Sequence, residues 1–323
     1  MKRNICTLIF LVGLVGCGSE PENAALEESH NVDLSPLIGG EPTGRNIHRA
    51  VGALVNLDYL GTQSAFCSGT LIRPDVVLTA AHCVVDKPGW RSTKRYYFTQ
   101  EPYATPLGRG NPVAAARAIA HPFYQSGAKA PLYKRRKPLD TAEADALETL
   151  DRECPGMSPD ADPRDLWSCV GTLPWYTLEI LGFNPWNTRS DDIALVKLER
   201  PITDTAPIAL PSEPWCDADT ELTVVGYGIN TYEKTWWRTD GERRHGSAMT
   251  YIVGHYEAWA LGRTAQLCSG DSGGPALRQV GGAFEVLGVA ARARHKDGKC
   301  DGLSAYTRVD AYMPWIQKTL HEI

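Results

Sequence analysis

The chain has 323 residues, of which 43% are hydrophobic and 22% are charged, and its formal net charge is -5 at pH 7. This composition is typical of a folded globular protein and argues against disorder as the main state. The slight acidic excess provides no attraction for a phosphate backbone, so nucleic acid is not an expected partner.

The first residues have the pattern of an export signal. Lys2 and Arg3 precede an apolar stretch, residues 5–15, that is too short to span a bilayer. We therefore predict a signal peptide over residues 1–16. It ends in LVGC, at Cys17, which resembles the lipobox of bacterial lipoproteins, where the cysteine after the cut carries lipid. This predicts a lipid-anchored protein of the bacterial cell envelope, and the alternative is an ordinary signal peptide and a secreted protein.

The rest of the chain divides into a polar linker and one folded domain. Residues 17–36 are polar and acidic without sustained periodicity, which predicts a tether or prosegment. The folded domain is expected over residues 37–323. Short apolar runs within it alternate with Gly, Pro, Asn and Asp, as in RAVGALVNL, GTLIRPDVVLTAA, DIALVKL, ELTVVGYG and FEVLGVAARA. Many short strands favour an all-β sandwich or barrel.

Two stretches have helical spacing. In the C-terminal DAYMPWIQKTLHEI, Asp310 is placed to cap a helix and Pro314 falls in its first turn. In LDTAEADALETLDREC, residues 139–154, Asp140 is placed to cap a helix with an apolar face. A closing helix and one further helix are therefore predicted.

Three residues have the chemistry of a nucleophilic site. The stretch CSGDSGGP, around Ser272, is either a surface turn or a serine held beside backbone N–H groups that face a developing oxyanion. A serine hydroxyl needs an adjacent base that a third group orients. His82 ends the apolar run LTAAHC, and Asp192 opens the buried-strand pattern DIALVKL. A buried carboxylate needs a hydrogen-bond partner, and a histidine Nδ1–H is a suitable one.

In this order, LTAAHC, DIALVKL and CSGDSGGP resemble the trypsin-like serine proteases of the chymotrypsin fold. The resemblance covers Leu37 to Ile323 apart from an insertion at about 126–190. It implies an all-β fold of two packed six-stranded antiparallel β-barrels, with a C-terminal helix and a long inserted loop region. It also implies a serine endopeptidase that cleaves protein or peptide substrates through an acyl-enzyme, without a metal or an organic cofactor.

The resemblance assigns a role to each residue of the site. Ser272 would attack the scissile carbonyl, and His82 would take its proton and return it to the leaving amine. Asp192 would hold the imidazole tautomer and stabilise the imidazolium. The backbone N–H groups of Gly270 and Ser272 would form the oxyanion hole.

Activation is expected to follow cleavage of the prosegment. In the family, the acid before the serine, here Asp271, pairs with the new N-terminal ammonium, which Leu37 would supply. The residue before this cut is Pro36, where the family usually has Arg or Lys, and a cut one residue later would leave Ile38 as the terminus. Autoactivation after a basic residue is therefore not expected here. We expect a separate activating protease instead.

The residues that line the implied substrate pocket depart from those of trypsin. Gln266 stands where trypsin has the acid that selects Arg and Lys, and a neutral amide cannot pair a guanidinium as a carboxylate does. Cleavage after Arg or Lys is therefore not expected to be favoured. The pocket walls align with the small residues Ala293 and Ser304. In the strand that lines the substrate, Ala291 and Arg292 replace a serine and an aromatic that are common in the family.

Export places the cysteines where disulfides persist. Of the nine cysteines, Cys6 leaves with the signal and Cys17 is assigned to lipid, so an odd number, seven, remains to pair. The resemblance implies the disulfides Cys67–Cys83 and Cys268–Cys300. The pairing of the other three stays open. A local Cys154–Cys169 bridge is one candidate, and Cys216 is the candidate for the cysteine without an intramolecular partner.

Two other functions share some of these features. A pseudoprotease that serves as a binding module would use the insertion as its interaction surface, but the complete triad argues against it. An esterase with the same triad is separated from a peptidase only by substrate tests. Metal-dependent hydrolysis has no support, because the chain has no H-E-x-x-H or comparable ligand spacing. Neither the oligomeric state nor the physiological substrate follows from the sequence.

Overall fold

The structure is a computed structural model that describes residues 40–57, 63–85, 96–104, 111–124, 148, 152, 191–228, 241–296 and 299–323. Several predictions fall outside these ranges. They concern the signal peptide and tether, Leu37 and the helix and insertion between 126 and 190, of which only Glu148 and Arg152 are described. Cys17, Cys154 and Cys169 also lie outside the described residues. No helix of the described residues is long and apolar enough to cross a membrane.

The first barrel is closed by six antiparallel strands. Short alternating or fully apolar runs form them, and they hydrogen-bond in the order β2 (Val51–Leu57), β3 (Gln63–Arg73), β4 (Val76–Thr79), β7 (Ala194–Leu198), β6 (Val113–Ala120) and β5 (Tyr96–Thr99). β5 pairs with β2 and closes the ring. Leu54, Leu71, Phe98 and Val196 fill its interior, so the alternating residues of the strands form a packed core.

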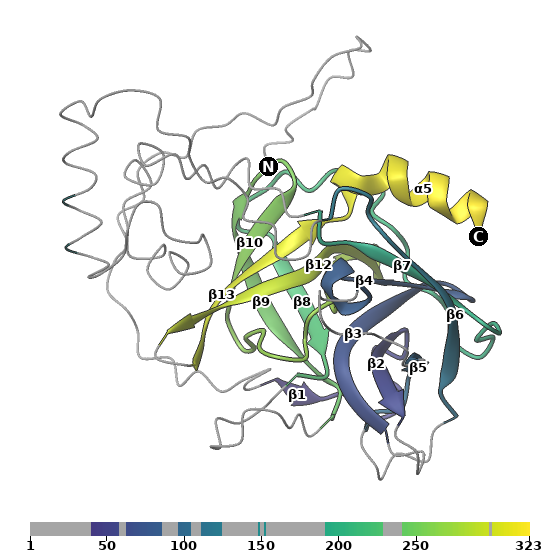
Figure 1. Cartoon of the computed structure of the whole chain (residues 1–323). Coiled ribbons are helices and arrows are strands. Elements are labelled where there is room, and N and C mark those ends of the chain that lie inside the picture. The colour runs from purple at the N-terminus through teal and green to yellow at the C-terminus, as the bar shows by residue number, and fades with distance from the viewer. Residues whose placement is uncertain are drawn as a thin grey trace. The chain divides into compact units, whose positions relative to one another are not determined.

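The second barrel is built from the C-terminal half of the chain (Figure 1). Its strands pair in the order β9 (Arg244–Val253), β10 (Glu257–Gly262), β13 (Lys299–Arg308), β12 (Ala283–Lys296), β11 (Pro275–Val280) and β8 (Glu221–Gly226). β8 also pairs with β9, which closes the barrel, and the two-residue β1 (Glu41–Pro42) is added at β9. The predicted fold of two six-stranded antiparallel barrels is confirmed.

The chain ends in the predicted helix, α5 (Met313–Glu322), with Pro314 in its first turn. The prediction that Asp310 caps it is wrong. A 3-10 turn, η4 (Asp310–Tyr312), precedes the helix, so the N-cap residue is Tyr312 and no side chain caps it. Asp310 instead accepts hydrogen bonds from the Trp215 amide at 2.9 Å and from Arg308 Nε at 3.0 Å, because the neighbouring guanidinium attracts its carboxylate.

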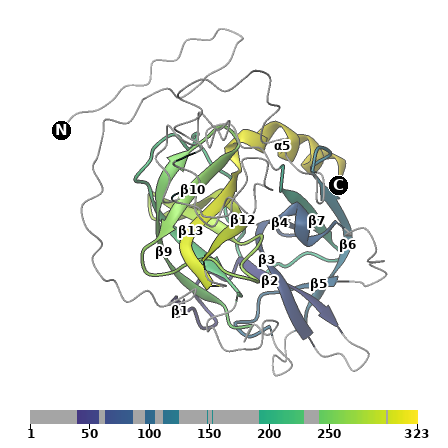
Figure 2. The same ribbon diagram turned by 60° about the vertical axis from the view of Figure 1, so that its left-hand side comes forward.

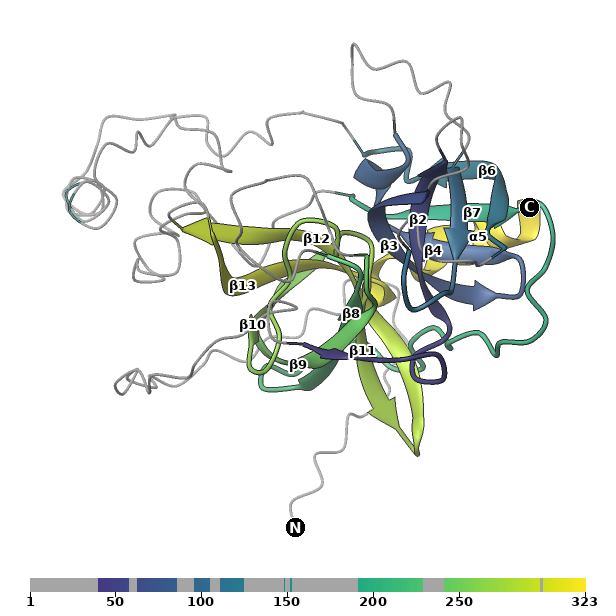
Figure 3. The same cartoon turned by 90° about the horizontal axis from the view of Figure 1, so that it is seen from below.

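One apolar cluster is shared by both barrels and the helix. Leu78 and Ile193 of the first barrel pack with Val225 and Val289 of the second and with Ile316 of α5. Figures 2 and 3 show β2–β7 on one side of this junction and β8–β13 on the other. The cluster fixes the ends of β4, β7 and β11 relative to one another, and the candidate site lies where these ends meet.

Candidate active site

His82 lies in a 3-10 turn directly after β4. Ala80 and Ala81 are fully buried, so the turn η1 (Ala81–Cys83) packs closely against the barrel. A disulfide joins Cys83 to Cys67 of β3. The backbone on both sides of His82 is therefore fixed, and its side chain is only 28% exposed.

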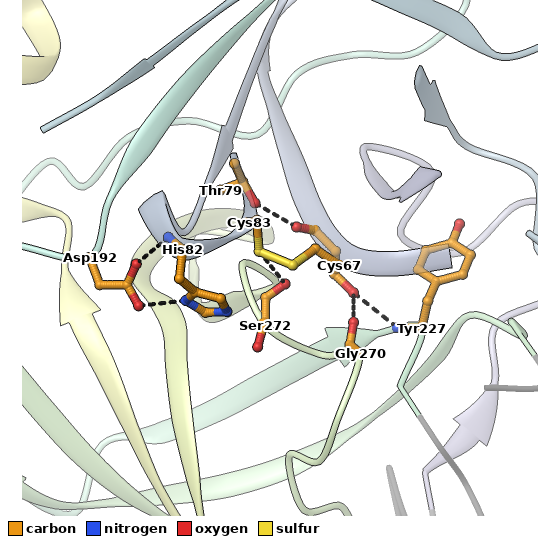
Figure 4. Close-up of a disulfide and its surroundings, with 9 residues drawn as sticks. Cys67, Thr79, His82, Cys83, Asp192, Tyr227, Gly270 and Ser272 are labelled. Atoms are coloured by element: carbon orange, nitrogen blue, oxygen red, sulfur yellow. Dashed lines mark hydrogen bonds and ion pairs between the residues drawn. A yellow bond between two sulfur atoms is a disulfide. The ribbon is translucent and has the colours of Figure 1, made fainter. Parts of the chain in front are cut away.

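Asp192 directly precedes Ile193 and β7, and it holds His82 at two points. Its Oδ2 lies 2.7 Å from His82 Nδ1, and its Oδ1 accepts the His82 backbone N–H at 2.9 Å (Figure 4). The residue is only 5% exposed, so these bonds provide the partners that a buried carboxylate requires. The Thr307 hydroxyl donates to the Asp192 carbonyl at 3.1 Å, which ties this residue to β13. Burial and, secondly, the Asp192 charge raise the pKa of Tyr124.

Ser272 lies beside the His82 imidazole, in the loop before β11 (Figure 4). Its carbonyl accepts the Ser68 amide of β3 at 2.8 Å, so the serine of the second barrel is attached to the first. Within the described residues, no hydrogen bond joins its hydroxyl to the His82 ring. Such bonds are often long before substrate binds, and they shorten in the complex.

Two backbone amides beside the Ser272 side chain are not used in hydrogen bonds within the described residues. The amides of Asp271, Gly273 and Gly274 donate to carbonyls of the loop or of β12, whereas those of Gly270 and Ser272 donate to no group in the described part of the chain. Gly270 has φ of 97°, a left-handed conformation that favours glycine. Two unused amides beside a serine hydroxyl are the elements of an oxyanion hole.

Asp271 lies under this loop and is fully buried. Its Oδ1 accepts the Gly228 amide at 2.8 Å, and its Oδ2 accepts the Cys268 amide at 2.9 Å. A Cβ built on Gly226 or Gly228 would lie 2.0 or 2.3 Å from these oxygens, so a side chain at either position would displace the Asp271 carboxylate. Burial and, secondly, the Asp271 charge raise the pKa of Tyr306. The predicted partner of Asp271, the Leu37 ammonium, lies outside the described residues.

The predicted pocket residues come from neighbouring segments. Gln266 is 4% exposed, and its side chain lies against Gly302, where a Cβ would be 3.8 Å from Oε1. Within the described structure, this Oε1 is buried and has no hydrogen-bond partner. Ala293 and Ser304 face each other in the pairing of β12 with β13. A disulfide between Cys268 and Cys300 links the serine loop to β13, and Ala293 packs against it.

Arg292 has a partner that the sequence did not predict. Arg292 donates to Glu257 of β10 through Nη1 at 2.9 Å and Nη2 at 2.6 Å, and its guanidinium lies 5.9 Å from the Trp259 ring. Burial opposes the charge of Arg292, but the Glu257 carboxylate outweighs it and raises the pKa of the guanidinium. The two residues are 35 positions apart. The one sequence signal for this ion pair is the acid within the apolar stretch EAWAL. The preceding Ala291, which is also predicted to lie on the strand along the substrate, is 7% exposed.

A second missed group supports Asp192. The preceding Asp191 has φ of 50°, and its Oδ1 accepts the Tyr312 hydroxyl at 3.0 Å and lies 3.3 Å from His121 Nδ1. These contacts fix the left-handed turn that aims Asp192 at His82. Cys67, His82 and Cys83 also lie close together, but both sulfur atoms belong to the disulfide and offer no thiolate to a metal.

Two closed antiparallel barrels with a serine and an aspartate-held histidine at their junction define the class of chymotrypsin-like serine proteases. Comparison with known proteins agrees with this class. The family model described as Trypsin matches residues 38–135 and 176–316, and the chain belongs to that family. The residues between the two matched parts fall within the predicted insertion.

Relatives of the chain include serine proteases and a serine protease homolog of animals. Chymotrypsin-like elastase family member 1 of Macaca fascicularis is 25% identical over 88% of this chain and 89% of its own length. The thrombin-like enzyme gloshedobin of Gloydius shedaoensis is 24% identical over 88% and 87%. The snake venom serine protease homolog HS120 of Bothrops jararaca is 28% identical over 88% and 87%. The protein is thus a trypsin-family serine protease, a hydrolase, at considerable distance from these relatives.

Proposed function

We propose that the protein is an exported serine endopeptidase in which Ser272, His82 and Asp192 form the catalytic triad. The observation that carries the proposal is the double hydrogen bond between His82 and Asp192 beside Ser272. A carboxylate that accepts the Nδ1 proton leaves Nε2 free to act as the base.

The proposed reaction uses one acyl-enzyme intermediate. Ser272 Oγ attacks the carbonyl carbon of the scissile peptide while His82 Nε2 takes the serine proton. The amides of Gly270 and Ser272 bind the resulting oxyanion, a contribution of about 3 kcal/mol for each donor. His82 then gives its proton to the leaving amine, and water hydrolyses the acyl-enzyme by the same steps in reverse.

The enzyme is proposed to be made as a zymogen. Asp271 is a fully buried carboxylate under the loop that carries both oxyanion amides. An ammonium on Leu37, freed by cleavage, would pair with this carboxylate and hold the loop in its active form. Because Pro36 precedes the cut, a separate protease of different specificity is the proposed activator.

The specificity proposal rests on Gln266. A neutral amide at the base of the pocket offers an NH2 donor group and a carbonyl acceptor but no charge, so Arg and Lys are not the preferred residues at the cut. A neutral side chain that donates a hydrogen bond to the buried Oε1 of Gln266 fits this pocket best.

Export through a lipoprotein signal is the remaining part of the proposal. It rests on the LVGC sequence at Cys17 and the polar tether that follows it. Lipid on Cys17 would anchor the peptidase to a membrane of the bacterial cell envelope, and an ordinary signal would release it as a secreted enzyme.

Active-site labelling with a fluorophosphonate tests the proposed function. The soluble chain from Gly18 is compared with a chain cut before Leu37, each with Ser272→Ala and, as a matched control in the same loop, Ser269→Ala. We expect labelling only after the cut. The label should be lost in Ser272→Ala and retained in Ser269→Ala, and the cut wild type should turn over peptides.

Absence of labelling with a verified Leu37 terminus would overturn the peptidase proposal. The binding-module function, with the insertion as the interaction surface, would then take its place. Labelling with turnover of esters but of no peptide in a diverse library would instead favour an esterase.

A further inference from the structure

Ser68 connects the first barrel to the loop that carries the two unused amides. It is fully buried in β3, next to Cys67. Its amide donates to the Ser272 carbonyl at 2.8 Å, and its hydroxyl donates to the Gly270 carbonyl at 3.0 Å. One residue of the first barrel therefore holds the carbonyl of each residue whose N–H forms the proposed oxyanion hole.

The Ser68 hydroxyl both donates and accepts a hydrogen bond. Besides donating to Gly270, it accepts the Tyr227 backbone N–H at 3.1 Å. Tyr227 follows β8, so the hydroxyl bridges two segments of the second barrel from outside it. A buried hydroxyl that donates once and accepts once has a defined direction, and it can hold a peptide group in one orientation.

Holding the Gly270 carbonyl matters because Gly270 is conformationally free. Its φ of 97° is a value that residues with a Cβ rarely adopt, and glycine changes readily from it to other conformations. Rotation of the peptide groups around Gly270 would turn its N–H away from the oxyanion. The hydrogen bond from Ser68 opposes this rotation, since it fixes the carbonyl on the other side of the same Cα.

We propose that Ser68 is a positioning residue of the oxyanion hole, acting on catalysis through the Gly270 carbonyl. This inference rests on the proposed function, because it assumes that Gly270 and Ser272 bind the oxyanion. The Ser68 side chain is fully buried, and it bonds to neither the Ser272 hydroxyl nor the His82 ring. Its effect is on the transition state, where the charge on the oxygen develops, and much less on substrate binding.

The test is a kinetic comparison of Ser68→Ala with wild type, both cut before Leu37. A peptide p-nitroanilide that the wild type turns over gives kcat and KM. A peptide trifluoromethyl ketone of the same sequence reports on the oxyanion hole, because its adduct with Ser272 carries an oxyanion. We expect kcat to fall about 10- to 100-fold with little change in KM, and affinity for the ketone to fall by a similar factor.

Thr79→Val is the matched control. The Thr79 hydroxyl donates to the Ser68 carbonyl at 2.8 Å, is equally buried, and bonds to neither Gly270 nor Ser272. Its loss should lower the thermal midpoint as Ser68→Ala does, while kcat stays within about twofold of wild type. A purely structural role of Ser68 would make the two variants alike in kcat.

Ser68→Gly keeps the proposal testable if the alanine variant does not fold. Removing the whole side chain leaves space about the size of a water molecule between the Tyr227 amide and the Gly270 carbonyl, and a water there can replace the hydroxyl. We expect its kcat to lie between those of Ser68→Ala and wild type.

The role of Ser68 and the proposed function can fail separately. If wild type is labelled at Ser272 but Ser68→Ala and Ser68→Gly keep wild-type kcat and ketone affinity, the role of Ser68 is refuted and the proposed function stands. If the cut wild type shows no Ser272-dependent labelling, the proposed function itself fails, and the role of Ser68 with it.

Discussion

At the residue scale, Gln266 bears on what the proposed pocket accepts, and His48 bears on how the stability of the fold depends on pH. At the proposed base of the pocket, Gln266 combines burial with an acceptor that has no partner in the described structure. At the entry to the first barrel, His48 lies 5.1 Å from the His245 ring and 5.2 Å from Phe284. A single substitution at Gln266 can therefore test substrate preference, and one at His48 can test the pH dependence of stability.

Gln266→Asp should change the preference at the cut site. A carboxylate there would pair a substrate guanidinium or ammonium, so we expect kcat/KM for Arg and Lys peptides to rise at least about tenfold over wild type. A peptide library with every residue at the cut position measures this. Gln266→Asn, which stays neutral, is the control. If both variants leave Arg and Lys peptides as poor substrates, Gln266 does not form the base of the pocket.

His48→Asn should weaken the acid sensitivity of the fold. Burial, followed by the charges of His245 and Arg243, lowers the pKa of His48 from 6.5 to about 4. Between these values the unfolded chain binds a proton that the folded chain does not, so stability falls as the pH drops from 6.5 to 4. Asn accepts the left-handed backbone at φ of 52° and does not titrate.

Urea unfolding at several pH values measures this effect. We expect the free energy of unfolding of His48→Asn to fall less steeply than that of wild type over this window, and in parallel with it above pH 7. Identical slopes below pH 6.5 would show that His48 is protonated equally in both states.

Among the elements, α5 contributes to the site without touching it. The helix covers the cluster shared by both barrels, and Ile316 is its fully buried residue there. The 3-10 turn before it places the Tyr312 hydroxyl on Asp191, next to the proposed catalytic acid. The end of the chain thus supports the junction at which the triad is proposed to assemble.

Ile316→Ala should destabilise the whole domain. A cavity at this position costs about 2–5 kcal/mol in the free energy of unfolding, because both barrels border it. Chemical denaturation measures the loss, with the exposed neighbour Gln317→Ala as the control. An equally small loss in both variants would mean that the helix is not part of the core.

At the scale of the whole molecule, the site belongs to neither barrel alone. His82 and Asp192 flank strands of the first barrel, whereas Ser272 and Asp271 precede β11 of the second. The hydrogen bonds of Ser68 cross between them. Outside this domain, the predicted anchor at Cys17 determines where the proposed peptidase would act.

Cys17→Ser should release the protein from the membrane. If Cys17 carries lipid, the wild-type chain expressed in a bacterial host will partition into detergent and incorporate labelled palmitate. The serine variant will do neither. A soluble wild-type protein without label would instead favour the ordinary signal peptide, and activity assays on both forms would show whether the anchor matters for catalysis.

The sequence by itself determined the fold class and the candidate triad. Alternating apolar runs predict strands because their period is local, and the motifs around His82, Asp192 and Ser272 carry their chemistry within a few residues. It also predicted the helix at the C-terminus, although the cap at Asp310 was wrong, since Arg308 and Trp215 compete for that carboxylate.

Only the tertiary structure decided the contacts between distant segments. The hydrogen bond of Ser68 to Gly270 joins residues 202 positions apart, and the pairing of Arg292 with Glu257 joins two strands of the second barrel. No local pattern encodes such partners, because they depend on how the strands register and how the barrels meet. The sequence therefore supplied the reactive groups, and the packing of two barrels determined what holds each of them in place.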